Sequence, residues 1–202
     1  MTQLTAVEFW FDPGCPWAWM TSRWVVEAAE VRPLDIHWRL MSLALLDEGK
    51  EESDASREGH WKGHLQLRVI AAARDVHGDQ VVLPLYTAFG TRFHLRKESR
   101  GPETTVAALA DAGLDVGLVD AMDDAQWDAA IRADHDAGLG RVGDGVGTPA
   151  IAVGDTAFFG PVVTPAPKGE AAGLLWDGVL LVAGTPGFYE LKRTRDQGPI
   201  FD

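Results

Sequence analysis

Segments with strand character lie near both ends of this chain and are separated by a long stretch that has none. Residues 6–11 form a short, mostly apolar run rich in aromatic side chains, and residues 34–41 alternate between apolar and polar. Near the other end, residues 150–153 and 156–159 flank Gly154-Asp155, a pair suited to a two-residue hairpin loop. These patterns predict strands in two clusters, one near each end of the sequence.

Residues 47–141, between the two clusters, show helical periodicity and no convincing strand. Apolar side chains recur at helical spacing in segments that begin at a proline or end at a glycine, as helices often do. The segments are residues 64–77 before Gly78, residues 85–93, the stretch from Pro102 to Gly113, and residues 127–135 before Gly138. They predict a compact, all-helical unit.

This order of elements constrains the fold. Two domains in series would not place strands on both sides of one helical unit, so we expect an α/β domain with a large all-helical insertion. The α/β domain takes residues 1–46 and 142–202, and the insertion domain takes residues 47–141. Residues 169–176 and 186–195 are expected to close the chain as two helices.

The single cysteine, Cys15, stands at a position that favours reactivity. It follows the first strand and an Asp12-Pro13-Gly14 turn, and it opens a helix whose first position suits Pro16. The first amides of a helix lack partners and its dipole end is positive, so both favour the thiolate, which is the nucleophile. A lone cysteine is more often a buried, inert side chain. One cysteine also excludes an intramolecular disulfide, which suits a reducing compartment.

Several segments resemble a known family. Residues 11–17, around Cys15-Pro16, resemble the active-site segment of the DsbA-like branch of thioredoxin-fold proteins, whose layout includes a long helical insertion. The wider chain is similar to the actinobacterial mycothiol-dependent nitroreductases. The likeness is carried by residues 9–13, 19–24, 41–44, 147–149, 158–162 and 190–195.

The resemblance implies a thioredoxin-like fold with Cys15 as the reactive group and mycothiol, or another low-molecular-weight thiol, as co-substrate. It implies reduction of small electrophiles such as nitroaromatics, with a reductant of the mycoredoxin or thioredoxin type as a partner. A proline at the start of a strand is usually trans and structural. In a thioredoxin-like fold, however, Pro149 would follow a cis bond and lie against the cysteine, and Thr148 and Pro149 would position the thiol. Trp17 and Trp19 either line an apolar pocket there or pack in the core, the role favoured for Trp19.

One departure from the family pattern concerns Ala18. The pattern has a second cysteine three residues after the first, and this chain has Ala18 there. No other thiol of the chain can therefore resolve a mixed disulfide. Either the protein follows a monothiol route in which a free small thiol completes the cycle, or Ala18 is a replacement made to trap an intermediate.

Two other interpretations stay open. Kappa-class glutathione transferases and hydroxychromene-carboxylate isomerases share the fold and the insertion, but they typically have a serine where Cys15 stands. The missing second cysteine favours this interpretation and Cys15 opposes it. In the second interpretation, the chain is a non-catalytic module that binds a thiol or a partner protein.

The net charge of −12 argues against partnership with nucleic acid or an anionic membrane surface. No apolar run is long enough to span a bilayer, and the N-terminal residues carry no signal-peptide pattern. We therefore expect a cytoplasmic protein that binds small molecules.

Other candidate sites are weaker. His60 and His64 are four residues apart, as metal ligands on a helix can be, but no H-E-x-x-H pattern surrounds them, and we expect no metal. Asp144-Gly145-Val146-Gly147 follows no strand and lacks the third glycine of a dinucleotide fingerprint, so we expect no nucleotide cofactor. His94 and His135 are expected to be packing residues of the helical unit, although His94 could also face Cys15.

Overall fold

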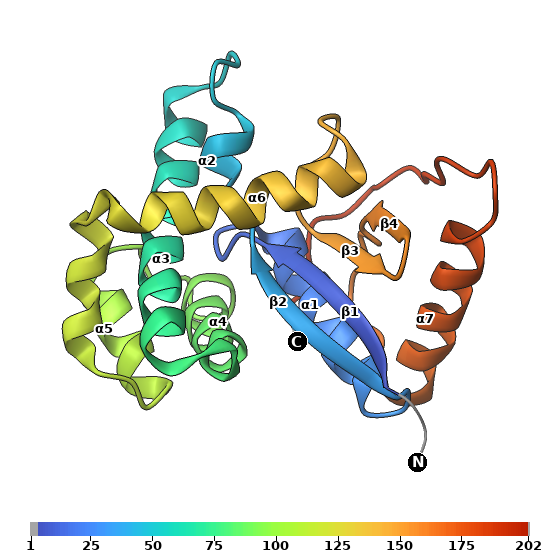
Figure 1. Cartoon of the computed structure of the whole chain (residues 1–202), viewed down its shortest axis with the longest axis horizontal. Helices are drawn as coiled ribbons and strands as arrows, with labels where there is room; N and C mark the ends of the chain where they lie inside the picture. The colour runs from blue at the N-terminus through green and yellow to red at the C-terminus, as the bar shows by residue number, and fades with distance from the viewer. Residues whose placement is uncertain (1–3, 202) are drawn as a thin grey trace.

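The computed structural model describes residues 4–201. One sheet contains the strands β1 (Thr5–Phe11), β2 (Leu34–Leu40), β3 (Ala150–Val153) and β4 (Thr156–Phe159). The α-helices are α1 (Pro16–Ala29), α2 (Leu43–Leu46), α3 (Asp54–His77), α4 (Val82–Gly90), α5 (Pro102–Asp111), α6 (Asp128–Val142) and α7 (Gly169–Ala183). Short 3₁₀ segments cover Asp79–Val81, Val116–Asp123 and Ala125–Trp127, and a π-helical turn covers Thr91–Leu95. The strands occur where the sequence predicts them, and α2 to α6 lie between β2 and β3 in the chain (Figure 1).

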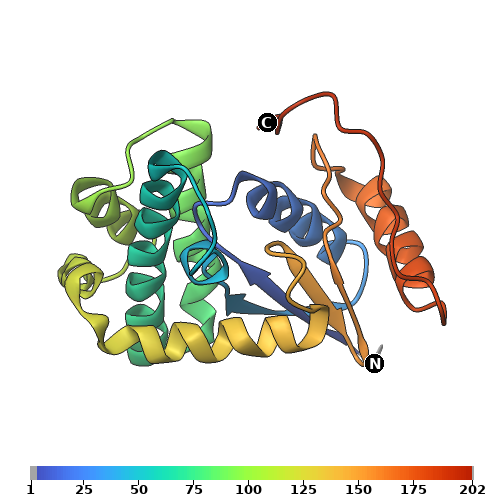
Figure 2. The same ribbon diagram turned by 90° about the horizontal axis from the view of Figure 1, so that it is seen from above.

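Strand β1 is central in the sheet, whose order is β2-β1-β3-β4. It pairs in parallel with β2 and antiparallel with β3, which pairs antiparallel with β4. Helices α1 and α7 lie on one side of the sheet, and α6 crosses its other side (Figure 2). Because β1 is covered on both faces, its sequence reads as a nearly continuous apolar run rather than as an alternation.

The two faces of β1 contact different partners. Phe9 and Phe11 point into the main core, and Trp10 packs on the other face with Met41 below helix α6. The indole of Trp10 donates a hydrogen bond to the carbonyl oxygen of Asp134 at 2.9 Å. A Cβ atom at Gly138 would lie 2.7 Å from Met41 and 2.9 Å from Trp10. The prediction that Gly138 ends this helix is wrong: α6 continues to Val142, and Gly138 lets it approach the sheet closely.

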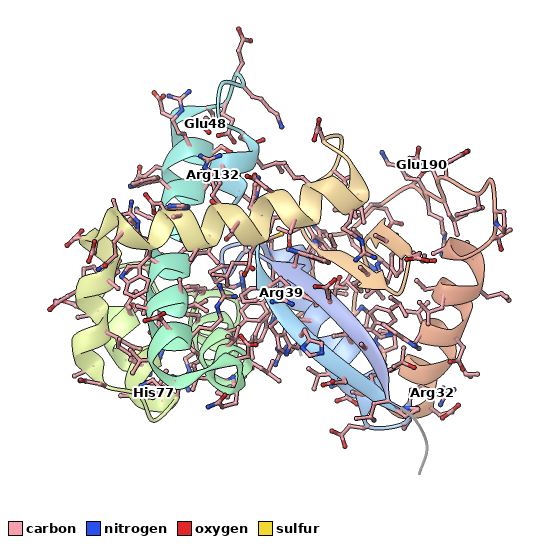
Figure 3. All side chains as sticks on the ribbon, in the orientation of Figure 1. Arg32, Arg39, Glu48, His77, Arg132 and Glu190 are labelled. Carbon is pink, nitrogen blue, oxygen red and sulfur yellow. The ribbon has the colours of Figure 1, made fainter. Side chains whose placement is uncertain are left out.

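The end of the chain differs from the prediction. Helix α7 is longer than expected, and Arg32 pairs with its Glu170 and Asp177 at 2.8 and 2.7 Å (Figure 3). The helix predicted over residues 186–195 is absent; residues 184–201 form neither helix nor strand. This segment, the C-terminal segment from here on, holds Glu190 and is mostly exposed. It has no apolar stripe to bury, and a short helix needs such burial to be stable.

One core joins the sheet to the helices that follow it. Phe11 of β1 stacks on Tyr86 of α4 with ring centroids 3.9 Å apart, and both are completely buried. The division into an α/β domain at 1–46 and 142–202 and an insertion domain at 47–141 stays a prediction. Within residues 4–201, no helix has the length and apolar character that crossing a membrane requires.

Candidate active site

Cys15 is the N-cap residue of helix α1. Its backbone is extended, with φ −81° and ψ 114°, and Pro16 occupies the first helical turn. The backbone amide of Ala18 donates to the Cys15 sulfur at 3.4 Å, so the thiol takes the place that a serine or aspartate oxygen takes at other helix starts. The Cys15 amide donates to the carbonyl of Asp12 at 3.0 Å, which closes the turn after β1. The position of Cys15 at a helix start agrees with the sequence prediction.

The structure brings Thr148 and Pro149 to this sulfur. The Cys15 thiol donates to the backbone carbonyl of Thr148 at 3.6 Å. The Thr148 hydroxyl donates to the carbonyl of Trp10 at 2.9 Å, which fixes the Thr148 segment against β1. The Thr148–Pro149 peptide bond is cis, and the amide of Gly160 donates to the Pro149 carbonyl at 2.8 Å. Residues far apart in the sequence thus meet at one sulfur atom.

The protonation state of Cys15 differs from the expectation. Only 7% of the residue is exposed, and burial raises the pKa of its thiol to about 11. The amides of Ala18 and Trp17 and the charge of Arg100 lower this pKa, while the carboxyl group of Asp12 raises it. The prediction of an ionised thiol is wrong for this closed structure, because the loss of solvation outweighs the stabilisation by the helix start. Cys15 is a thiol at neutral pH here.

Ala18 and the two tryptophans of the motif occupy different environments. Ala18 is completely buried, and the site contains one sulfur. Trp19 is buried and packs edge-on against Tyr86, in agreement with the core role favoured for it. Trp17 is partly buried, and the guanidinium carbon of Arg195 lies 4.5 Å from the centre of a Trp17 ring. Of the two tryptophans in the motif, Trp17 is therefore the one that is partly exposed.

The family model described as Rv2466c-like, mycothiol-dependent nitroreductase Rv2466c, matches residues 14–193. The chain belongs to this family. The chain is also similar to the uncharacterized protein Rv2286c of Mycobacterium tuberculosis. The two are 31% identical over 201 residues, which cover 98% of this chain and 85% of the relative. The resemblance inferred from the sequence is confirmed.

Solved structures agree on the fold of this mycothiol-dependent nitroreductase family member. The probable DsbA oxidoreductase SCO1869 of Streptomyces coelicolor superposes with a TM-score of 0.62 at 18% identity and covers 96% of this chain and 95% of its own. The cytosolic disulfide reductase DsbM of Pseudomonas aeruginosa, solved with GSH, gives 0.56 at 14% identity, over 87% and 99%. A 2-hydroxychromene-2-carboxylate isomerase gives 0.57 at 15% identity, over 77% and 88%. The thioredoxin-like, DsbA-like fold is confirmed.

Asp12 is a buried carboxyl group beside the thiol of the nitroreductase-family motif. Its Oδ1 accepts from the amide of Gly14 at 2.7 Å, and its Oδ2 accepts from the amide of Leu43 at 2.9 Å. Burial raises the pKa of Asp12, and the two amides and the charge of Arg100 oppose that rise. The sequence indicated only a turn at Asp12. The signal that could have identified it is an acidic residue directly between a buried strand and an active-site helix.

Two side chains from the segment after α4 hold the turn that precedes Cys15. Nε2 of His94 donates to the carbonyl of Pro13 at 3.0 Å, and Arg100 donates to the carbonyl of Gly14 at 2.8 Å. Burial lowers the pKa of His94 to about 4, so its imidazole is neutral. A Cβ atom at Gly14 would lie 2.6 Å from the guanidinium group of Arg100, so a larger residue there would displace that side chain. His94 is buried like the predicted packing residue, and it also holds the active-site turn; no sequence signal indicated Arg100.

The two histidines considered as metal ligands, His60 and His64, have different partners. His64 binds Ser42 and Asp128 at 2.9 Å each and is buried. Nδ1 of His60 lies 3.0 Å from Glu52 and 3.2 Å from Asp47, and the three ligand atoms are close enough to hold an ion. Distances of this kind also describe ordinary ion pairs. Both sets of partners are distinct from the Cys15 contacts described above.

Proposed function

We propose that Cys15 is the nucleophile of a thiol oxidoreductase that reduces a small electrophile at the expense of mycothiol. One observation carries the proposal. The Cys15 sulfur, at the start of α1, contacts the carbonyl of Thr148, and the peptide bond that follows Thr148 is cis. Once the Cys15 thiol no longer donates to the Thr148 carbonyl, the backbone of Thr148 is free to pair with an extended thiol ligand. Membership in the mycothiol-dependent nitroreductase family supports mycothiol as that ligand.

The proposed cycle balances with one protein thiol and two molecules of mycothiol. A nitroaromatic compound accepts two electrons and two protons from the Cys15 thiol and one mycothiol thiol, and it yields a nitroso compound and water. The two sulfurs form a mixed disulfide. A second mycothiol thiolate then attacks the mycothiol sulfur of this disulfide, releases Cys15 and forms mycothiol disulfide.

Ala18 supports the monothiol form of this cycle. In a protein with a second active-site cysteine, that residue attacks the mixed disulfide from within the chain. Cys15 is the one cysteine of this sequence, so release must come from an external thiol. We place the protein in the cytoplasm, where small thiols are kept reduced. We also propose that a reductant of the mycoredoxin or thioredoxin type can replace the second mycothiol in releasing Cys15.

The test is intact-mass analysis after incubation with mycothiol disulfide at a mildly alkaline pH. We expect one mycothiol adduct on the wild type, its loss on adding reduced mycothiol, and no adduct on Cys15→Ser. Glutathione disulfide serves as the matched control ligand. Absence of the adduct on the wild type, or an equal adduct on Cys15→Ser, would overturn the proposal.

A coupled assay separates this function from thiol conjugation or isomerisation. An oxidoreductase produces mycothiol disulfide in proportion to the electrophile reduced, whereas a transferase consumes thiol without forming disulfide and an isomerase consumes none. We expect disulfide formation with a nitroaromatic substrate. Turnover without disulfide would favour the transferase or isomerase alternative, and tight thiol binding without turnover would favour the binding module.

A further inference from the structure

The C-terminal segment, residues 184–201, returns from the end of α7 toward the start of α1. Figure 2 shows it doubling back beside α7 and ending near α1 and the helices that follow β2. Most of its residues are exposed, and it forms neither helix nor strand. Its course is therefore determined by a few individual contacts at its far end.

These contacts lie on both sides of the Cys15 turn. Arg195 rests on the ring of Trp17 at 4.5 Å, two residues after the cysteine. Phe201 stacks on His94 with centroids 5.6 Å apart and an interplanar angle of 19°. His94 in turn bonds the carbonyl of Pro13, two residues before the cysteine.

Two further contacts fix the end of the segment. The amide of Ile200 donates to the hydroxyl of Thr164 at 2.7 Å, in the loop after β4. The ammonium group of Lys97 lies 4.2 Å from the ring centre of Phe201. The segment is thus attached to the loop after β4 and to the segment after α4, as well as to α1.

We propose that residues 184–201 are a strap that closes the active site and that must leave Trp17 before a substrate reaches Cys15. The inference rests on the proposed function of Cys15 and adds the control of access to it. Arg195 occupies the partly accessible ring of Trp17, on which an aromatic electrophile would stack. Cys15 is only 7% exposed while the strap is in place.

The composition of the strap suits reversible release. Its anchors are two cations on aromatic rings, one aromatic pair and one hydrogen bond, and none of its residues belongs to the fully buried core. Contacts of this kind are individually weak at a solvent-exposed site. A substrate with an aromatic ring would compete with Arg195 for Trp17 and so promote its own entry.

The experiment measures the rate of Cys15 alkylation by iodoacetamide at one fixed pH. The variants are Arg195→Ala, Phe201→Ala and a chain that ends at Gly184. We expect about a two- to fivefold faster rate for each point variant, since each removes one weak anchor, and about a tenfold or greater increase for the shortened chain. Circular dichroism and alkylation in denaturant verify that all variants are folded and carry a free thiol.

Arg193→Ala is the matched control, because it removes the same charge two residues away, where the side chain makes no hydrogen bond, ion pair or ring contact with the described residues. We expect its rate to equal that of the wild type. Rates within twofold of the wild type for all three strap variants, or an equal acceleration by Arg193→Ala, would overturn the strap. Mycothiol adducts measured in parallel test the proposed function separately, because iodoacetamide reports access without requiring mycothiol to bind.

Discussion

The sulfur of Cys15 lies 3.6 Å from the backbone carbonyl oxygen of Thr148, a residue 133 positions away in the sequence. The thiol donates to this carbonyl, so the contact belongs to the protonated form of the cysteine. Ionisation of Cys15 removes the donor and frees the carbonyl. The first step of any reaction at this sulfur thus also changes the group beside the cis Thr148–Pro149 bond that an extended ligand would use.

Arg100→Met should make Cys15 less reactive at a given pH. Arg100 donates to the carbonyl of Gly14, and its charge lowers the pKa of the Cys15 thiol. Loss of the charge should raise that pKa further and slow alkylation about two- to threefold at pH 8. The measurement is the rate of iodoacetamide alkylation from pH 7 to 9.5. Arg96→Met, in the same segment, is the control and should not change the dependence of the alkylation rate on pH. An unchanged pH dependence for Arg100→Met would contradict the prediction.

Asp12→Asn should alter stability in a pH-dependent way. Burial raises the pKa of Asp12 above its ordinary value of 3.8, so the folded state holds this proton more tightly than the unfolded state. The resulting stabilisation is complete below about pH 4 and is lost as pH rises through the raised pKa. The advantage of the wild type over Asp12→Asn in free energy of unfolding should therefore shrink from pH 4 to pH 7. Urea denaturation at both values measures it, and a constant difference would refute this assignment.

His94→Gln should reduce the sensitivity of the fold to mild acid. Burial lowers the pKa of His94 from 6.5 to about 4, so the unfolded chain takes up a proton in this range and the folded chain does not. Stability from this group is present above pH 6.5 and is lost as pH falls toward 4, by about 2 kcal/mol at pH 4.5. Glutamine can still donate to Pro13 but does not titrate. Denaturation curves at pH 7 and about 4.5 should show a smaller loss for the variant; an equal loss would contradict the prediction.

Gly138→Ala and Gly140→Ala form a matched pair within α6. A Cβ at Gly138 would meet Met41 at 2.7 Å and Trp10 at 2.9 Å, whereas a Cβ at Gly140 meets nothing within 4 Å. We expect Gly138→Ala to destabilise the protein by about 1–3 kcal/mol through overpacking. Gly140→Ala should stabilise it by about 0.5–1 kcal/mol through helix propensity. Urea denaturation measures both, and equal effects would show that α6 does not approach the sheet as closely as described.

Ala18→Cys should give the site an internal resolving thiol. The amide of residue 18 already donates to the Cys15 sulfur, and the side chain at 18 is buried next to the start of α1. We expect mild oxidation to remove both free thiols of this variant by forming a 15–18 disulfide, and the mycothiol adduct to become short-lived. Thiol titration and intact mass measure these outcomes. Ala18→Ser, the control, should keep the stable adduct; two persistent free thiols in Ala18→Cys would refute the expectation.

The sequence predicted the parts of the site that local patterns encode. The apolar run of β1, the turn after it and Pro16 placed Cys15 at a helix start, and six short segments spread along the chain indicated the family. The length of α6 was not predictable, because Gly138 is a helix terminator by propensity and only the close approach of Trp10 shows its other role. Tertiary packing outweighed the local signal there.

Two further features depended on three-dimensional context. The helix start of Cys15 favours a thiolate, but the degree of burial, which no local pattern reports, decides its pKa. Residues 186–195, within the strap, were predicted as a helix from their local pattern, whereas the contacts of Arg195, Ile200 and Phe201 define the course of the strap. Arg100 contacts Gly14 across 86 positions, a distance at which a single sequence gives no signal.

The turn before Cys15 is held by His94 and Arg100, which come from the segment after α4 and not from the motif. Relatives with an identical Cys15 motif can therefore differ in nucleophilicity through substitutions in that segment alone. Differences in thiol reactivity within the family would then arise from residues some eighty positions away from the reactive sulfur in the sequence.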